Sequence, residues 1–415
     1  MPTLRTLRAL GITLAVAVIG TVAVSAGTSA NNQSAKVVIW ADADRVAAVT
    51  QVASAWATSK GATVEVVQKD FGQIRSQLTT VAAETAPDVI VGAHDWVGEL
   101  SANGSILPLS PSAATKKQFP AYALNSFSYG TAIKKLYGAP VALENIALIT
   151  NTKLAKVPTS FADMEKQALA AKKKTKAQVG IAVQQGSGGD AFHMYPFFSG
   201  LGGYIFGTNK AGNLDASDIG VANAKFLKNA PLIDKWNKEA LIRSQVAWDT
   251  GRDLFTKGKV AYYITGPWFV SDIKKSGVPY KISAFPDIVP GIKSVPFLGV
   301  QGFMVTKFSA AHGVESLAKD LVASYMMRPA SQLALAAANG RFPANTAAAK
   351  LVKDADLQAF GKASAGGVPM PNIPQMASVW GDLGAAWVRS TKGAGAIPAR
   401  KSFIGAQKSI AQKIG

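Results

Sequence analysis

The residues best suited to bind a ligand lie near the C-terminus, in the run Met370–Met376 and at Trp380. Pro371 and Pro374 predict an extended entry followed by a helix start, because proline is accommodated in a helix only in its first turn. Met376 and Trp380, four residues apart, would share one face of that helix. An indole held there offers a flat platform with one N–H donor, suited to the apolar face of a pyranose. The same spacing also fits a capped helix with a tryptophan in the core.

Charged and aromatic residues also follow two predicted strands. The apolar strand 36–40 runs into Asp42–Arg45, and strand 87–91 is followed by His94–Trp96. In an α/β protein, ligands bind beyond the carboxyl ends of the strands. These clusters therefore predict a binding site at one sheet edge, although ordinary polar loops would look the same.

Glu144 stands inside the apolar run 141–149. Burying a carboxylate costs several kcal/mol unless it is hydrogen-bonded, so we expect this side chain to have fixed partners.

Alternating strands and helices surround these residues. Val49, Val52, Ala53 and Trp56 have helical spacing, and Gly61 is expected to end that helix. Further segments are predicted as strands at 63–67, 180–183 and 260–264, as a helix through Ile74 and Leu78, and as a helix pair over 218–236. The pattern predicts an α/β fold with mostly parallel sheets.

Chain length, net charge and the lack of cysteine exclude several classes of protein. The chain has 415 residues, enough for two or three domains, and a net charge of +19. Its lysines are densest at Lys172–Lys176, with no nucleic-acid motif and no interleaved aromatic residue, so we expect no nucleic acid as a partner. The absence of cysteine excludes disulfides, thiolate catalysis and zinc–thiolate sites.

The first 30 residues are typical of a secretory signal peptide. Arg5 and Arg8 precede the apolar run Ala9–Val24, and small residues favour cleavage after Ala26 or Ala30. Sixteen apolar residues are few for a membrane-spanning helix. We therefore expect an exported protein, in the periplasm or at the outer face of the envelope, without the lipid-modified cysteine of related receptors.

Four motifs occur in an order that resembles one family. They are His94-Asp95 after Ala93, the Phe255–Gly258 run, Gly266-Pro267-Trp268, and the Met370–Met376 signature followed by Trp380. Together they resemble maltose/maltodextrin-binding proteins, the extracytoplasmic sugar receptors of ABC importers, from about Lys36 to the C-terminus.

The resemblance implies a two-lobe periplasmic-binding-protein fold, in which each lobe is a mostly parallel sheet flanked by helices and three hinge crossovers join them. The N-terminal lobe would comprise 36–142 plus 301–345, and the C-terminal lobe 146–298 plus 350–415. The crossovers would lie near 141–146, 298–301 and 342–345, with the second leading into a strand at 301–305.

Carried over motif by motif, the family's site has a polar and an aromatic part. The ligand-binding residues implied are Asp44, Arg45, Asp95, Glu144 and Asp190, with Trp96, Phe192, Trp248, Trp268 and Trp380 as stacking partners. No catalytic residue, metal or cofactor is implied. Gly92 stands where the family often has a stacking tryptophan, and Trp96 is expected to replace it. Gly381 and Gly384 replace a tyrosine and an arginine, so maltose is less strongly implied than a related oligosaccharide.

The function implied is a monomeric receptor that captures maltose, maltodextrin or a related oligosaccharide and delivers it to an ABC permease. Paired carboxylates in an aromatic cleft also fit a secreted glycoside hydrolase acting on α-glucans. A receptor for a polyamine or a metal is a third alternative, less consistent with so many aromatic residues.

Overall fold

The computed structural model describes residues 34–130 and 133–415, which form an α/β protein built on two main sheets. The predicted signal peptide, residues 1–30, lies outside the described residues. In the described part of the chain, no helix is both long enough and apolar enough to cross a bilayer.

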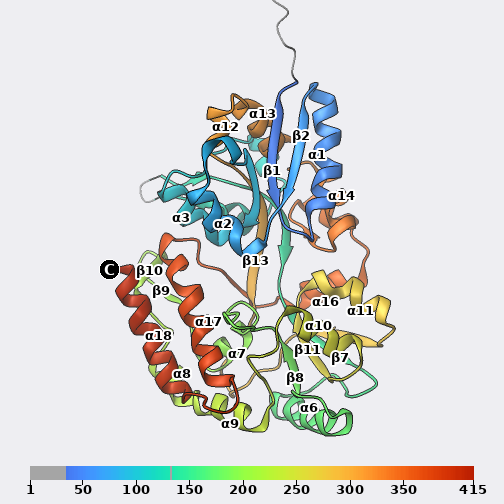
Figure 1. Cartoon of the computed structure of the whole chain (residues 1–415), viewed down its shortest axis with the longest axis vertical. Helices are drawn as coiled ribbons and strands as arrows, with labels where there is room; N and C mark the ends of the chain where they lie inside the picture. The colour runs from blue at the N-terminus through green and yellow to red at the C-terminus, as the bar shows by residue number, and fades with distance from the viewer. Residues whose placement is uncertain (1–33, 131–132) are drawn as a thin grey trace, which may run out of the picture. The chain divides into compact units, whose positions relative to one another are not determined.

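The first sheet contains seven strands. Their order is β14 (Phe342–Pro343), β6 (Ala139–Glu144), β13 (Phe297–Val305), β3 (Val89–Ala93), β1 (Lys36–Ala41) and β2 (Thr63–Gln68), with β15 (Val368–Pro369) beside β13. β1 pairs in parallel with β2 and β3, whereas β13 is antiparallel to β3 and β6. The helices of this lobe are α1 (Val46–Lys60), α2 (Phe71–Thr80), α3 (Val97–Ala102), α4 (Ala113–Lys116), α5 (Ala121–Ser126), α12 (Phe308–Ala311), α13 (Glu315–Asp320), α14 (Pro329–Asn339) and α15 (Thr346–Leu351) (Figure 1).

Helix α1 shows why these residues fold as predicted. Val49, Val52 and Trp56 are buried on its inner face, which packs against β2 and α14. Gly61 ends the helix at φ 62°, a left-handed conformation that glycine adopts without strain. The Trp56 indole N–H donates to Asp320 Oδ2 at 2.8 Å, which satisfies its polar atom inside the core.

The second sheet has the order β12 (Tyr280–Ser283), β7 (Ala147–Asn151), β11 (Tyr262–Thr265) and β8 (Ile181–Val183). β11 is parallel to β8, and β7 is antiparallel to β11 and β12. Three of its four strands therefore run in one direction. The helices of this lobe are α6 (Phe161–Thr175), α7 (Tyr195–Gly200), α8 (Ala224–Asn229), α9 (Pro231–Glu239), α10 (Trp248–Thr256), α11 (Val270–Ser276), α16 (Ala355–Ala363), α17 (Ala377–Thr391) and α18 (Ala399–Ile414).

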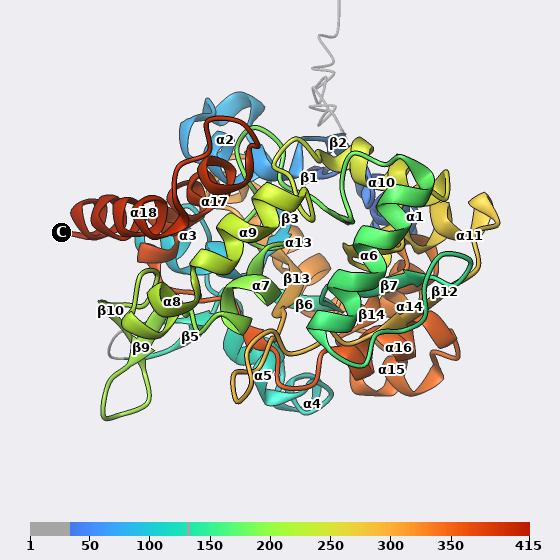
Figure 2. The same ribbon diagram turned by 90° about the horizontal axis from the view of Figure 1, so that it is seen from below.

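Helices α17 and α18 lie side by side and pack on α9 (Figures 1 and 2). Trp387 on α17 and Trp236 on α9 are fully buried there, and Trp387 meets the ring of Phe403 edge-on at 5.1 Å. Two short antiparallel hairpins complete the described strands: β4 (Ser128–Tyr129) with β5 (Lys135–Leu136), and β9 (Phe206–Thr208) with β10 (Leu214–Ile219).

Two details differ from the sequence prediction. The second crossover and the strand after it form one nine-residue strand, β13, instead of a loop followed by a strand. The helix pair begins at Ala224, and Asp218 belongs to β10. The helix starts there because the Asn223 side chain caps it, accepting from the N–H groups of Lys225 and Phe226.

The crossover positions follow from sheet membership. β6 ends at Glu144 in the first sheet, and β7 begins at Ala147 in the second. The chain returns at β13, and after β14 it reaches α16, which packs on β12. The two-lobe α/β fold is thus confirmed, while the exact lobe limits remain a prediction. The sheets are mixed, whereas the sequence pattern predicted mostly parallel ones: β13 is antiparallel to β3 and β6 in the first sheet, and β7 to β11 and β12 in the second.

Candidate functional site

A cavity of about 380 Å³ lies where the strand ends of the two lobes meet. It is lined by residues from both lobes and from the crossovers. All ten residues predicted from the sequence line it: Asp44, Arg45, Asp95, Trp96, Glu144, Asp190, Phe192, Trp248, Trp268 and Trp380. A larger cavity of about 650 Å³, lined mainly by α11, α14 and α16, adjoins it and shares Asp44 and Trp268.

Two of the indoles lie directly over glycines. A Cβ on Gly92 would come within 2.1 Å of the Trp96 ring, and one on Gly266 within 2.2 Å of the Trp268 ring. Only glycine therefore leaves room for each ring to fold back over its own strand end. The two glycines thus allow Trp96 and Trp268 to lie against the backbone at the edge of the cavity.

Helix α17 places the third indole as the sequence predicts. A 3₁₀ turn over Pro374–Met376 leads into α17, Met376 is fully buried, and Trp380 is half-buried at the cavity. The Asn372 amide just before this turn donates to the carbonyls of Ser126 and Ser128 at 2.9 and 3.0 Å. The signature therefore both anchors the segment on the first lobe and presents an indole to the cavity.

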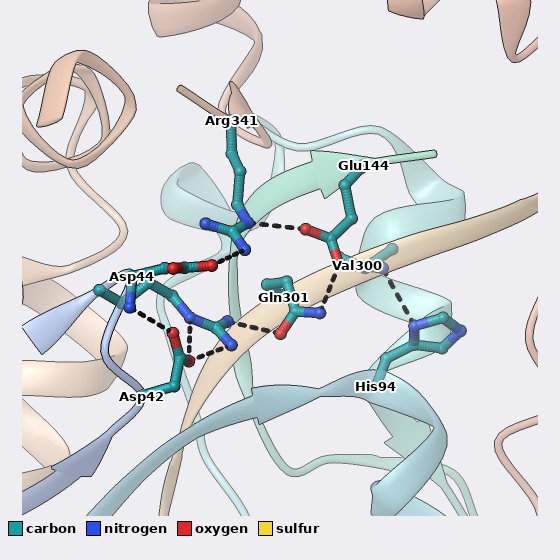
Figure 3. Close-up of polar contacts among 8 residues, drawn as sticks. Asp42, Asp44, His94, Glu144, Val300, Gln301 and Arg341 are labelled. Carbon is teal, nitrogen blue, oxygen red and sulfur yellow. Dashed lines mark hydrogen bonds and ion pairs between the residues drawn. The ribbon is translucent and has the colours of Figure 1, made fainter. Parts of the chain in front are cut away.

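Glu144 is bonded to side chains from the other two crossovers. Its Oε1 accepts from Gln301 Nε2 at 2.6 Å, and its Oε2 accepts from Arg341 Nε at 2.7 Å. Glu144 is 9% exposed and Arg341 5% exposed, so this is a buried ion pair. Figure 3 shows both partners converging on the carboxylate, which meets the expectation that Glu144 has fixed partners.

The same network continues to the strand end of β1. Gln301 Oε1 accepts from Arg45 Nη1 at 2.6 Å, and Arg45 Nε donates to Asp42 Oδ2 at 2.6 Å. Asp44 lies 3.6 Å from Arg341 Nη2. These hydrogen bonds form a chain that runs from Asp42 through Arg45 and Gln301 to Glu144, and Figure 3 labels Asp42, Gln301 and Glu144 along it. These residues thus form a polar layer in the cavity lining whose charges are largely paired.

Asp95 also lines the cavity. It is 4% exposed, and its Oδ2 accepts from the Trp380 indole N–H at 2.9 Å, a bond between the two lobes. Burial raises the pKa of Asp95 to about 6, against the opposing attraction of Arg75. Its neighbour His94 is structural: Nδ1 accepts from the Val300 N–H, so Nε2 donates to the Met370 carbonyl. Burial lowers the pKa of His94 to about 4, which keeps it neutral.

Gln184, Asp190 and His193 form a second small network in the cavity lining. Asp190 Oδ1 accepts from the His193 backbone N–H at 2.9 Å, and Oδ2 accepts from Gln184 Nε2 and His193 Nδ1, each at 2.8 Å. Phe192 lies beside it, with its ring centre 6.4 Å from that of Trp268 and stacked on Phe297 at 6.3 Å.

A family model described as "Bacterial extracellular solute-binding protein" matches residues 51–362. The chain belongs to that family. Among its relatives is the maltodextrin-binding protein MdxE of Bacillus subtilis, 30% identical over 332 residues, which cover 77% of this chain and 76% of the relative. The galactooligosaccharide-binding protein of the same organism is 27% identical over 370 residues, or 86% and 84% of the two chains. A maltooligosaccharide ABC transporter solute-binding lipoprotein of Streptococcus pneumoniae is 25% identical over 361 residues, or 85% and 83%. The sequence resemblance to extracytoplasmic receptors is thereby confirmed.

The cavity of this solute-binding protein is also lined by three residues from the predicted clusters and motifs that were not among the ten: Asp42, Ala93 and Met370. The sequence did not single out the other lining residues, which are Phe71, Gly72, Arg75, Gln184, His193, Gln301 and Arg341. His193 could have been found, because its spacing of three from Asp190 places the two side chains within reach. Gln301 and Arg341 carried no such signal, since their partners are far away in the sequence.

Proposed function

We propose that this chain is an exported, monomeric receptor that binds maltose, maltodextrin or a related oligosaccharide and delivers it to an ABC permease. The observation that carries the proposal is the combination of aromatic and charged side chains in the lining of the cavity. Indoles from both lobes line the cavity and suit the apolar faces of sugar rings, and the carboxylates and guanidinium groups of the same lining suit hydroxyl groups.

The charge of the cavity supports a neutral ligand. The chain carries a net charge of +19, yet the cavity lining contains five carboxylates (Asp42, Asp44, Asp95, Glu144 and Asp190) and three arginines (Arg45, Arg75 and Arg341). Most of these charges bond one another. A ligand rich in hydroxyl groups can donate to and accept from such a lining, whereas an anion or a polyamine would meet charges that are already paired.

The relatives support the class of ligand. Their names specify maltodextrin, maltooligosaccharide and galactooligosaccharide, and the family is one of extracellular receptors. The adjoining cavity beyond Trp268 would give room for further sugar units.

The hydrogen bonding of Glu144 and Asp190 does not favour these two carboxylates as the catalytic pair of an α-glucan hydrolase. Both oxygens of Glu144 and of Asp190 accept hydrogen bonds from the protein, and Asp95 bonds Trp380. A glycosidase needs one carboxyl free to donate a proton and one free to attack or to activate water.

We propose further that binding closes the lobes about the three crossovers. Asp44 and Asp95 come from the first lobe and Asp190, Trp268 and Trp380 from the second, so a sugar that contacts both walls would favour the closed state. The permease would then recognise that closed state. Small-angle scattering should show the radius of gyration falling on binding by on the order of an ångström, and an unchanged radius would indicate a rigid pocket.

Calorimetry and thermal shift with maltose, maltotriose, galactobiose and putrescine test the ligand class. A sugar should raise the melting temperature according to its affinity, and putrescine should not. Trp268→Ala and Trp380→Ala should each lose about 1–3 kcal/mol of binding, because each indole forms a wall of the cavity. Tyr122→Ala, an exposed aromatic outside the cavity, should bind as the wild type does. Binding of putrescine but of no sugar would refute the proposal.

A further inference from the structure

The wall formed by Gln184, Asp190 and His193 has two unpartnered polar atoms. His193 is 4% exposed, and its Nε2 is buried without a hydrogen-bond partner among the described residues. Gln184 Oε1 is in the same situation. Both residues line the cavity. Buried polar atoms in native proteins nearly always have a partner, so two without one on the same wall call for a ligand.

The hydrogen-bond roles of these atoms follow from Asp190. An ionised carboxylate only accepts hydrogen bonds, so each group that faces it must donate. Gln184 therefore turns its NH₂ group to Asp190, and its carbonyl Oε1 is left facing away. In a neutral imidazole, the Nδ1–H that faces Asp190 donates to the carboxylate and Nε2 is left as an acceptor.

The side chain of His193 is also fixed by its neighbours. The centre of its ring lies 5.8 Å from that of Trp268 and 5.6 Å from that of Phe192, both in edge-on contact. Asp190 accepts hydrogen bonds from the backbone N–H of His193 and from Nδ1. An acceptor held this rigidly beside an indole platform suits a hydroxyl group on a ring that stacks on that platform.

We propose that His193 is a specificity-determining residue of the sugar site, whose Nε2 accepts a hydrogen bond from one hydroxyl of the pyranose beside Trp268, with Gln184 Oε1 as the adjacent acceptor. Asp190 is then a positioning residue, which sets the tautomer of His193 and the orientation of the Gln184 amide. This inference rests on the proposed function, and it adds that the ligand must carry a free hydroxyl at that ring position.

The test compares His193→Phe, which keeps the ring volume and removes the acceptor, with His193→Gln, whose amide can reach the position of Nε2. Calorimetry is carried out with maltotriose and with a set of monodeoxy methyl maltosides. His312→Phe is a matched control, because His312 also pairs through Nδ1 with an aspartate, Asp88 at 2.7 Å, and it lies outside the cavity. Melting temperatures of the unliganded variants report folding.

We expect His193→Phe to bind maltotriose roughly tenfold more weakly, His193→Gln to recover part of that loss, and His312→Phe to bind like the wild type. For the wild type, one monodeoxy sugar should bind roughly tenfold more weakly than its parent sugar. For His193→Phe, the same deoxy sugar and its parent should bind equally well, because the hydrogen bond that the deoxy sugar lacks is already absent. If every deoxy sugar loses as much affinity with His193→Phe as with the wild type, His193 bonds no hydroxyl and the inference is wrong.

If His193→Phe does not fold, the same comparison is made with His193→Gln and His193→Asn. Asparagine can keep the bond to Asp190 but cannot reach the position of Nε2. A wild type that binds no sugar at all would instead overturn the proposed function, and with it this inference.

Discussion

The burial of Asp95 predicts how the stability of the protein depends on pH. Its carboxyl is buried and has a pKa of about 6, against an ordinary value of 3.8. Between these two values the folded protein holds a proton that the unfolded chain has released. Stability therefore falls as the pH rises through that window, and the loss is complete above pH 6. At neutral pH the protein thus folds at the cost of burying a carboxylate.

The substitution Asp95→Asn removes that cost. Each pKa unit corresponds to about 1.4 kcal/mol, so a shift of about two units implies a gain of about 3 kcal/mol at pH 7.5. The amide oxygen of asparagine can still accept from the Trp380 indole N–H, so the bond between the lobes should remain. For a chain of this size, such a gain raises the melting temperature by about 4 °C.

Urea and thermal unfolding of the sugar-free protein at pH 7.5, 6 and 4 measure the effect. The advantage of Asp95→Asn should be greatest at pH 7.5 and should vanish towards pH 4, where the wild-type carboxyl is protonated in the folded state. Asp253→Asn is a control of opposite sign, because the hydrogen bond from Lys257 lowers the pKa of that exposed carboxylate. An Asp95→Asn variant no more stable than the wild type at pH 7.5, or one whose advantage persists at pH 4, would refute the reasoning.

Two further predictions follow from the contacts of the site. Glu144→Ala should cost about 3–5 kcal/mol in urea unfolding, because it leaves Arg341 buried without its main partner. The double variant Glu144→Leu/Arg341→Met should cost clearly less than the sum of its single changes, and additive costs would show that the pair is not coupled. Gly92→Ala should cost about 1–3 kcal/mol in thermal unfolding and should weaken sugar binding, because its methyl group overlaps the Trp96 ring. Gly405→Ala, on α18 with open space around it, should be neutral or slightly stabilising, and equal effects at the two glycines would contradict the overlap.

Local signals in the sequence were enough for much of the fold. The apolar spacing through Val49 and Trp56, with Gly61 after it, predicted α1 because one helix face must be buried and one residue must end it. The strand ends at Asp42–Arg45 and His94–Trp96 were predicted to meet because the strands are parallel, and both clusters line the cavity.

The partners within the site were beyond such reasoning. Arg45 bonds a residue 256 positions away, and Glu144 bonds residues 157 and 197 positions away. No local pattern links these residues, because the strand order places β13 between β3 and β6. The predicted helix start at Asp218 is wrong for a different reason. Asn223 caps the helix through its side chain, so α8 begins at Ala224 and Asp218 belongs to β10.

The overlap between Gly92 and Trp96 bears on how this cavity could have diverged. The sequence resemblance implies an aromatic platform at the position of Gly92, but here the ring of Trp96 fills the space that a side chain at 92 would need. A side chain at 92 and the Trp96 ring in its present position therefore compete for the same space. A platform can move from one position to the other only if the Trp96 ring turns away or is replaced. A library that varies positions 92 and 96 together is the direct way to find the alternative arrangement.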